Sequence, residues 1–359
     1  MTLRRLHVTT TSAAYDVVVG PGVLERAHEY IRASARTEKI VFITDASVYA
    51  LHGERAAIGL APLGLDVLEF VVEPGERSKT PEQAATLWRA LAQSGVHRGD
   101  VVVALGGGVV GDLAGFVAAT YHRGMAFYQM PTTLLAQVDA AIGGKTAVDL
   151  PEGKNLVGAF HQPRAVLADT SALSTLSDRE FSTGMAEVVK HALIDGGSLH
   201  EWVGDNRAAI VTRDPQTLTD LVAEAAAVKV RIVGEDETEQ GVRAHLNYGH
   251  TLGHAIEALD GYDGRSHGEA VAIGMMFAAR VAAAHGFSDR VDEHRVALES
   301  FDLPTHGAGH AYADIARAWS GDKKYEAGMR FVLLEDLGKP VVVRDIDEAV
   351  LRDAYEAVR

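Results

Sequence analysis

The amino-acid sequence predicts an α/β, Rossmann-like N-terminal domain followed by a mainly α-helical C-terminal domain. Short apolar runs alternate with helical stretches up to about residue 169, and helical stretches follow one another from residue 178 onward. The chain also has 359 residues, more than one simple core usually contains. We therefore expect domains at residues 1–169 and 170–359, with the active site in the cleft between them, where pockets commonly form.

The first half has the pattern of a largely parallel sheet covered by helices. Residues 39–44, KIVFIT, and 100–105, DVVVAL, are apolar runs typical of strands that are buried on both faces. Thr80 and Pro81 begin a helix, with a hydroxyl cap followed by proline at the first helical position. Further strands are expected within 1–20 and at 65–72 and 125–130, and helices at 23–34, 80–94 and 109–120.

The second half is expected to be mostly helical because apolar residues recur there at helical spacing. The expected helices lie at 178–195, 199–211, 215–233, 246–259, 269–285, 290–301 and 346–358, and two short strands lie at 331–334 and 340–343. No apolar run reaches the roughly 18 residues of a membrane span. The N-terminus lacks the apolar core of a signal peptide, so we expect a cytoplasmic protein.

Charge and composition narrow the class of ligand. The net charge of −15 disfavours binding to nucleic acids and anionic membranes. Arginines outnumber lysines by 25 to 9, and most of the lysines fall in Gly-rich or His/Asp/Glu-rich stretches. This favours a local cationic pocket for an anionic small molecule. Because the chain has no cysteine, any zinc must be held by histidine and carboxylate.

Glycines follow the expected strand 100–105 and indicate a dinucleotide site. Backbone N–H groups of Gly106, Gly107 and Gly108 can approach a pyrophosphate at the start of the next helix. Asp45 and the Glu76–Lys79 stretch follow two other strands of the same sheet, and Asp45 can accept from a ribose hydroxyl. The alternative interpretation is a tight strand–helix turn without a ligand.

Three histidines indicate a metal site in the second half. His250 and His254 are four residues apart and therefore share a helix face, and His267 precedes another helical run. The alternative is that they are packing or surface residues. Glu187 and Lys190, at i and i+3, are either an exposed ion pair or, given their small apolar neighbours, a buried carboxylate with a cation.

Eight stretches occur in order between residues 45 and 324 and resemble the 3-dehydroquinate synthase family of sugar-phosphate cyclases. They are PGERSK, GGGVVGD, PTTLLAQVDAAIGGKTAVDLPEGKNLVGAFHQP, TLSDREF, GMAEVVKHALI, LNYGHTLGHAIE, HGEAV and GDKK. The resemblance implies NAD, a divalent metal and often a homodimer. It implies conversion of the anionic sugar phosphate 3-deoxy-D-arabino-heptulosonate 7-phosphate to 3-dehydroquinate and phosphate, in the shikimate pathway to chorismate and aromatic amino acids. The implied steps are transient oxidation by NAD, β-elimination, re-reduction and aldol closure.

The resemblance also implies roles for individual residues. The ligands of zinc, or alternatively cobalt, would be Glu187, His250 and His267, and His254 would contact substrate instead. The implied catalytic residues are Lys145, Lys190, Lys229, Arg243, Asn247 and His254. Further substrate contacts would be Arg123, Asp139, Lys154, Asn155 and one of Lys323 or Lys324. NAD contacts would be Asp45, Glu76, Lys79, Gly107, Gly108, Asp112, Thr132, Thr133, Thr175 and Glu180, with Asp139, Lys145 and Lys154 beside them.

Two positions depart from the family's commoner pattern: Ala147 replaces glycine and Asp149 replaces asparagine. The alternatives to this function are another sugar-phosphate cyclase, such as a 2-deoxy-scyllo-inosose, valiolone-type or amino-dehydroquinate synthase, and a metal-dependent dehydrogenase of the glycerol type, which would release NADH. A nucleotide-binding module without catalysis is a third. Lys229, Arg243 and Asn247 favour a carboxylate-bearing substrate.

Overall fold

The computed structural model describes residues 3–261, 264–321 and 329–359, so the predicted contacts Lys323 and Lys324 lie outside the described residues. The chain divides into two compact units. The first contains Met1–Ser177 and Arg213–Thr238, and the second contains Asp178–Thr212 and Glu239–Arg359. The predicted fold class, α/β followed by mainly helical, is confirmed.

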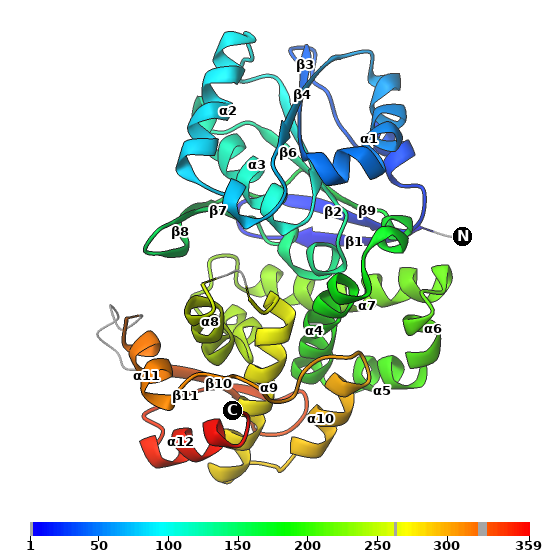
Figure 1. Cartoon of the computed structure of the whole chain (residues 1–359). Coiled ribbons are helices and arrows are strands. Elements are labelled where there is room, and N and C mark those ends of the chain that lie inside the picture. Colours follow the sequence, from blue (N-terminus) through cyan, green and yellow to red (C-terminus); the bar gives the residue numbers. More distant parts are fainter. Residues whose placement is uncertain (1–2, 262–263, 322–328) are drawn as a thin grey trace. The chain divides into compact units, whose positions relative to one another are not determined.

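A seven-stranded sheet forms the centre of the first unit (Figure 1), in the order β1-β2-β9-β6-β5-β3-β4. The strands are β1 (Arg4–Thr9), β2 (Ala14–Val19), β3 (Lys39–Asp45), β4 (Asp66–Val72), β5 (Val101–Gly106), β6 (Ala126–Pro131) and β9 (Ala165–Ala168). Neighbouring strands are parallel except for β1 with β2. The chain passes from β3 outward to β4 and then returns to β5 on the other side of β3, which creates a switch point where α/β proteins commonly bind ligands.

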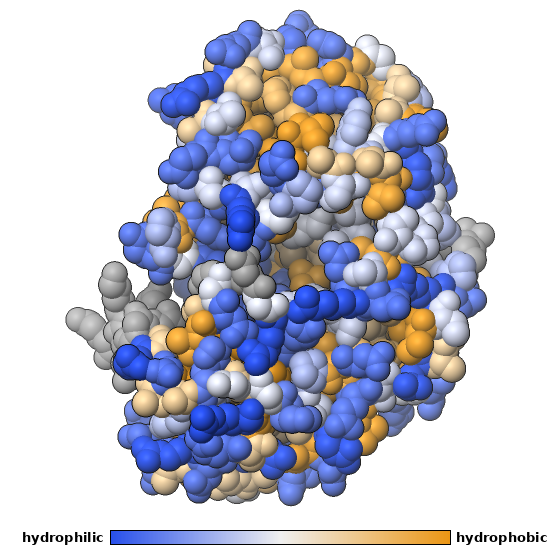
Figure 2. All heavy atoms as spheres, viewed as in Figure 1, coloured by the Kyte–Doolittle hydropathy of each residue, from blue (hydrophilic) through white to orange (hydrophobic). Residues whose placement is uncertain are grey.

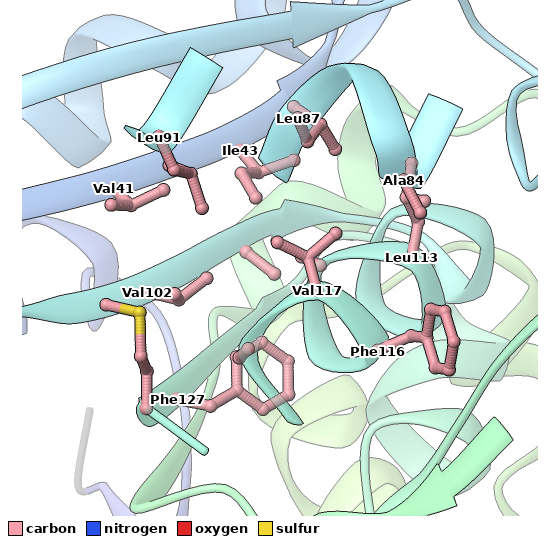
Figure 3. Close-up of a cluster of buried hydrophobic side chains, with 14 of the residues drawn as sticks. Val41, Ile43, Ala84, Leu87, Leu91, Val102, Leu113, Phe116, Val117 and Phe127 are labelled. Carbon is pink, nitrogen blue, oxygen red and sulfur yellow. The ribbon is translucent and has the colours of Figure 1, made fainter. Parts of the chain in front are cut away.

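Both faces of this sheet are covered, which explains its nearly continuous apolar strands. Side chains alternate along β3, so Val41 and Ile43 face one side and Ile40 and Phe42 the other. Val41 and Ile43 join a core with α2 (Pro81–Gln93) and α3 (Gly108–Thr120), which Figure 3 shows. Ile40 and Phe42 join a second core with α1 (Ala46–Leu60) and the 3₁₀-helix η1 (Leu24–Glu29).

Helix α7 (Pro215–Glu235) belongs to the first unit, whereas the predicted boundary after residue 169 placed it in the second. Its buried residues include Leu218, Leu221 and Val222. The helix packs against β1, β2 and the π-helix η5 (Ala136–Ala140). This apolar packing against strands far away in the sequence explains why position along the chain did not predict its unit.

In its described residues, the second unit is a group of helices with one β-hairpin. Its helices are α4 (Asp178–Asp195), α5 (Ser198–Asp205), α6 (Arg207–Val211), α8 (His250–Leu259), α9 (His267–Ala284), α10 (Val291–Glu299), α11 (Tyr312–Gly321) and α12 (Glu348–Glu356), and its hairpin is β10 (Arg330–Leu334) with β11 (Pro340–Arg344). Helix α9 is buried along most of its length and contacts α4, α8, α10 and α12.

The described helices include none that combines the length and apolar character needed to cross a membrane. Figure 2 shows hydrophilic residues over much of the face that it draws, with smaller hydrophobic areas between them. Such a surface agrees with the net charge of −15.

Several elements differ from the sequence-based prediction. The helix predicted at 23–34 is only η1, because Arg26 leaves helical geometry (φ −109°, ψ 16°). The helix predicted at 246–259 begins at His250, because Gly249 takes the left-handed region (φ 80°) after the 3₁₀-helix η7 (Val242–Asn247). The helix predicted at 199–211 is divided at Asn206. Helices α1 and α11, strand β9, and the hairpin of β7 (Lys145–Leu150) with β8 (Gly153–Phe160) were not predicted.

Candidate metal and dinucleotide sites

Glu187 and Lys190 form a buried ion pair on α4. Their side chains are 0% and 1% exposed, so the alternative of an exposed surface pair is wrong. Burial alone raises the pKa of Glu187, but the charge of Lys190 and then contacts with His250 and His267 hold that pKa well below its usual value. Glu187 is therefore an ionised carboxylate in an interior position.

Two imidazoles face the same carboxylate oxygen. His250 begins α8, and its Nε2 lies 3.5 Å from Oε1 of Glu187, while its Nδ1 lies 3.1 Å from the carbonyl oxygen of Tyr248. His267 begins α9, and its Nε2 lies 3.2 Å from the same Oε1, while its Nδ1 lies 3.3 Å from Oε2 of Glu257. In both rings Nδ1 faces an outer acceptor and Nε2 faces Glu187.

Glycines let the three helices approach closely enough for this arrangement. A Cβ at Gly268 would lie 2.6 Å from Cα of Thr183 on α4. A Cβ at Gly274 on α9 would lie 2.9 Å from the carbonyl carbon of Gly249, the residue before His250. Real Cβ atoms do not come this close to backbone atoms. The start of α9 is also fixed by Ser266, which caps it and accepts from the hydroxyl of Thr183 at 2.7 Å.

The three side chains fit a divalent metal. Ligand atoms of Glu187, His250 and His267 all lie within 4.8 Å of one another. Two tetrahedral zinc ligands at about 2.1 Å from the ion are about 3.4 Å apart, close to the 3.2 and 3.5 Å between the imidazoles and Glu187. Imidazole and carboxylate ligands suit zinc or cobalt.

His254 lies beside this group. Its side chain is exposed, and its ring centroid lies 5.2 Å from that of His250 and 6.3 Å from that of His267. The group that joins His250 and His267 to a third ligand atom contains Glu187, from a separate helix, in place of His254. Spacing along one helix alone could not distinguish these two sets.

The pKa of His267 reflects its two carboxylate partners. Burial alone lowers the pKa of this ring, but hydrogen bonds to Glu187 and Glu257 outweigh burial and raise it to about 10. In the metal-free protein at neutral pH, His267 is therefore charged, and a metal must displace its Nε2 proton.

The residues predicted to hold NAD in the first unit follow neighbouring strands. Asp45 ends β3, Gly107 follows β5, and Thr132 and Thr133 follow β6. Because β3, β5 and β6 are adjacent and parallel, these residues lie together at the carboxyl ends of the strands, beside the switch point of the sheet. Asp45 also caps α1, since its Oδ1 accepts from the backbone N–H of Val48 at 2.9 Å.

The helix after the triple glycine packs unusually close to the sheet. Gly107 is the N-cap of α3 and Gly108 its first residue. A Cβ at Gly111 would lie 2.8 Å from Oε1 of Gln129 on β6, and one at Gly115 would lie 3.0 Å from the ring of Phe127. The N-terminus of α3, which can bind an anion, is thereby held at the edge of the sheet.

Lys79 is the centre of a polar cluster in the same unit. Its ammonium lies 2.7 Å from Asp112, 2.5 Å from the side-chain oxygen of Asn155 and 3.6 Å from Glu76. Burial alone lowers the pKa of Lys79, but Asp112 and Glu76 raise it, so the side chain stays charged. Asp149, one of the two departures from the family pattern, lies 3.9 Å from Lys79 and accepts from the backbone N–H of Asn155 at 2.8 Å.

The remaining predicted residues of the first unit lie in three places. The β7–β8 hairpin carries Lys145 and Lys154, and Lys154 lies 3.6 Å from Glu76. Asp139, in the π-helix η5, forms an ion pair with Lys229 of α7. Isolated π-helical turns occur often at functional sites. Arg123 is exposed after α3, and Thr175 lies 3.0 Å from a ring nitrogen of His52.

In the second unit, Arg243 is 1% exposed in η7, and the side chain of Asn247 donates to Glu239 at 2.6 Å. Glu180 is exposed in the first turn of α4. Sequence reasoning missed Glu239 and Glu257. Glu257 could have been found, because it is seven residues after His250 and therefore shares its helix face.

Known proteins match nearly the whole chain. Residues 69–183 match the family domain described as 3-dehydroquinate synthase N-terminal, and residues 184–325 match 3-dehydroquinate synthase C-terminal. The chain belongs to the 3-dehydroquinate synthase family. A 3-dehydroquinate synthase from Caulobacter vibrioides (strain NA1000 / CB15N) is 46% identical, with 98% of this chain and 97% of that protein aligned.

Two solved sugar-phosphate cyclases share the fold of this member of the 3-dehydroquinate synthase family. A 2-deoxy-scyllo-inosose synthase with carbaglucose-6-phosphate, NAD⁺ and Co²⁺ is 29% identical, with a TM-score of 0.90, over 99% of this chain and 100% of that chain. The 2-epi-5-epi-valiolone synthase ValA from Streptomyces hygroscopicus subsp. jinggangensis 5008, with NAD⁺ and Zn²⁺, is 27% identical, with a TM-score of 0.86. The match covers 96% of this chain and 97% of that chain. The predicted family is thus confirmed.

Proposed function

We propose that this protein is a 3-dehydroquinate synthase, a lyase that converts 3-deoxy-D-arabino-heptulosonate 7-phosphate to 3-dehydroquinate and phosphate in the shikimate pathway. The observation that carries the proposal is the Glu187–His250–His267 group around a buried carboxylate, with Lys190 beside it, in a chain of this family. Its greater identity to a named 3-dehydroquinate synthase than to the two solved cyclases favours this reaction over theirs.

The cofactors are NAD and a divalent metal, zinc or cobalt, as in the two solved cyclases. When bound, NAD supplies a transient hydride acceptor and the metal a Lewis acid. Glu187, His250 and His267 would hold the metal. The residues at the carboxyl ends of β3, β5 and β6 would hold NAD, with Asp45 near a ribose and the N-terminus of α3 near the pyrophosphate.

The chain's own residues would bind and orient the substrate. We assign oxygens of the sugar to Lys190 and His254, and its carboxylate to Arg243 and Asn247. Arg243 is 1% exposed, and a guanidinium offers a planar fork of N–H donors that matches the geometry of a carboxylate.

Phosphate would bind to the cations Arg123, Lys145 and Lys154, with the amide of Asn155, whereas Lys229 would join Arg243 and Asn247 at the carboxylate. Three cationic groups can hold the departing phosphate and keep successive intermediates bound.

The decisive test is a stoichiometry measurement. With the heptulosonate phosphate and NAD⁺ present, the enzyme should release one phosphate per substrate while absorbance at the NADH wavelength stays flat. Stoichiometric accumulation of NADH would instead identify a dehydrogenase. Testing the substrates of other sugar-phosphate cyclases in parallel separates those activities, because each produces a different ring.

Two further proposals, on oligomeric state and on location in the cell, accompany this function. We propose that the protein forms a homodimer, which light scattering coupled to size-exclusion chromatography can test against a chain mass of 38.3 kDa. We also propose that it acts in the cytoplasm, where its metabolite substrates would be found; cell fractionation tests this location.

A further inference from the structure

Glu257 is a buried carboxylate to which the proposed reaction assigns no role. It lies on α8, seven residues after His250, and its side chain is 6% exposed. A carboxylate in such a position is costly unless it has a strongly polar partner. Its Oε2 lies 3.3 Å from Nδ1 of His267, across from the first residue of α9.

The two nitrogens of His267 face two different carboxylates. Nδ1 faces Glu257 at 3.3 Å and Nε2 faces Glu187 at 3.2 Å. A neutral imidazole carries one N–H and one lone pair. Once a metal displaces the Nε2 proton, the N–H that remains at Nδ1 can donate to Glu257, and the lone pair of Nε2 points toward the side where Glu187 and the metal would lie.

His250 offers an internal comparison. Its Nδ1 faces a neutral acceptor, the carbonyl oxygen of Tyr248, at 3.1 Å. The two rings are therefore held in the same way, but only His267 has a charged acceptor behind it. A carboxylate acceptor makes an imidazole more basic, and hence a stronger metal ligand, than a carbonyl acceptor does.

Position in the chain adds a reason for such a contact at His267. This residue begins α9, directly after the 260–266 segment, so the helix backbone supports it only on its C-terminal side. Glu257 comes from a different helix and fixes the ring from outside. The contact therefore also couples the C-terminal half of α8 to the start of α9.

We infer that Glu257 is a positioning residue that holds His267 with its proton on Nδ1 and so presents Nε2 to the metal. The inference rests on the proposed metal site. Glu257 itself does not touch metal or substrate in this role, and it acts through the orientation and basicity of His267.

Metal affinity tests this role without measuring turnover. Metal-free protein is titrated with zinc against a chromophoric chelator, without NAD or substrate. Glu257→Ala should weaken zinc binding by roughly 10- to 100-fold, as is typical for the loss of a partner behind a ligating histidine. Glu257→Gln, which keeps an oxygen acceptor but loses the charge, should fall between Glu257→Ala and the wild type. The absorption bands of the cobalt-loaded variants should shift as well.

The controls separate this inference from the metal site itself. Glu293→Gln removes a carboxylate that pairs with Arg290 at 2.7 Å on α10, and it should leave zinc affinity unchanged. Wild-type affinity in both Glu257 variants, with loss in His267→Ala, would overturn the role of Glu257 and leave the metal site standing. Wild-type affinity in His267→Ala would overturn the metal site. If Glu257→Ala does not fold, Glu257→Gln decides: roughly threefold or greater weakening supports the role, and a smaller change overturns it.

Discussion

Replacing Gly274 by alanine should damage the metal site from a position outside it. Gly274 lies on α9 where that helix crosses the start of α8. The added Cβ would lie 2.9 Å from the carbonyl carbon of Gly249 and 3.1 Å from the backbone nitrogen of Gly253, and it would overlap the carbonyl oxygen of Gly249. All three are backbone atoms, so no change of side-chain rotamer can relieve the overlap.

The magnitude follows from these distances. Non-bonded carbons prefer a separation of at least about 3.5 Å, so the two helices must move apart by at least about 0.6 Å. Gly249 directly precedes His250, so the imidazole moves with it. Metal ligands tolerate about 0.2 Å. We therefore expect Gly274→Ala to lose at least tenfold in zinc affinity and about 1–3 kcal/mol in the free energy of unfolding.

The assay pairs zinc competition with urea unfolding. Gly204→Ala is a matched control, because Gly204 is also a helical glycine of the second unit, but a Cβ added there would meet no other atom within 4 Å. That variant should keep wild-type zinc affinity, and its free energy of unfolding should rise by up to about 1 kcal/mol, since alanine favours helices more than glycine does. Wild-type zinc affinity in Gly274→Ala would show that the close helix crossing does not position His250.

Three further predictions concern buried charge and metal. Burial lowers the pKa of His294 to about 4, whereas an unfolded histidine takes up its proton near pH 6.5. The unfolded chain therefore gains a proton first as the pH falls, and the free energy of unfolding should drop by roughly 3 kcal/mol between about pH 6.5 and 4. Urea unfolding should show a smaller drop for His294→Gln than for the wild type. Equal drops in the two proteins would contradict this cause. Lys190→Met leaves Glu187 buried without the ammonium of Lys190, so the free energy of unfolding of the metal-free protein should fall by about 3 kcal/mol. Added zinc should then stabilise this variant more than it stabilises the wild type. A wild-type melting temperature of the metal-free variant would contradict the importance of the ion pair. A chelator should abolish turnover, and zinc or cobalt should restore it; full activity in the chelator would mean that no essential metal is bound.

Local signals predicted most of the regular structure. The helix α4 has the predicted bounds because its apolar residues recur at helical spacing from Asp178 to Asp195. Strands β3 and β5 were predicted within a residue because helices cover both faces of the sheet and leave continuous apolar runs. The β7–β8 hairpin was missed because its lysines and glycines, including Lys145 and Gly153, are typical of loops.

By itself, the sequence determined most of the strands and helices, the family, and the set of glycines, lysines and histidines proposed to carry the chemistry. These features depend on residue type and short spacing, which the chain displays directly. Helical spacing also placed His254 beside His250, and the two rings are neighbours in the structure.

Only the tertiary structure decided which side chains meet. Glu187 and His250 are far apart in the chain, and they face each other because glycines such as Gly274 let helix backbones approach more closely than any larger residue would permit. The same packing placed Glu257 behind His267. Such contacts depend on the distance between helix axes, which short-range sequence spacing does not encode.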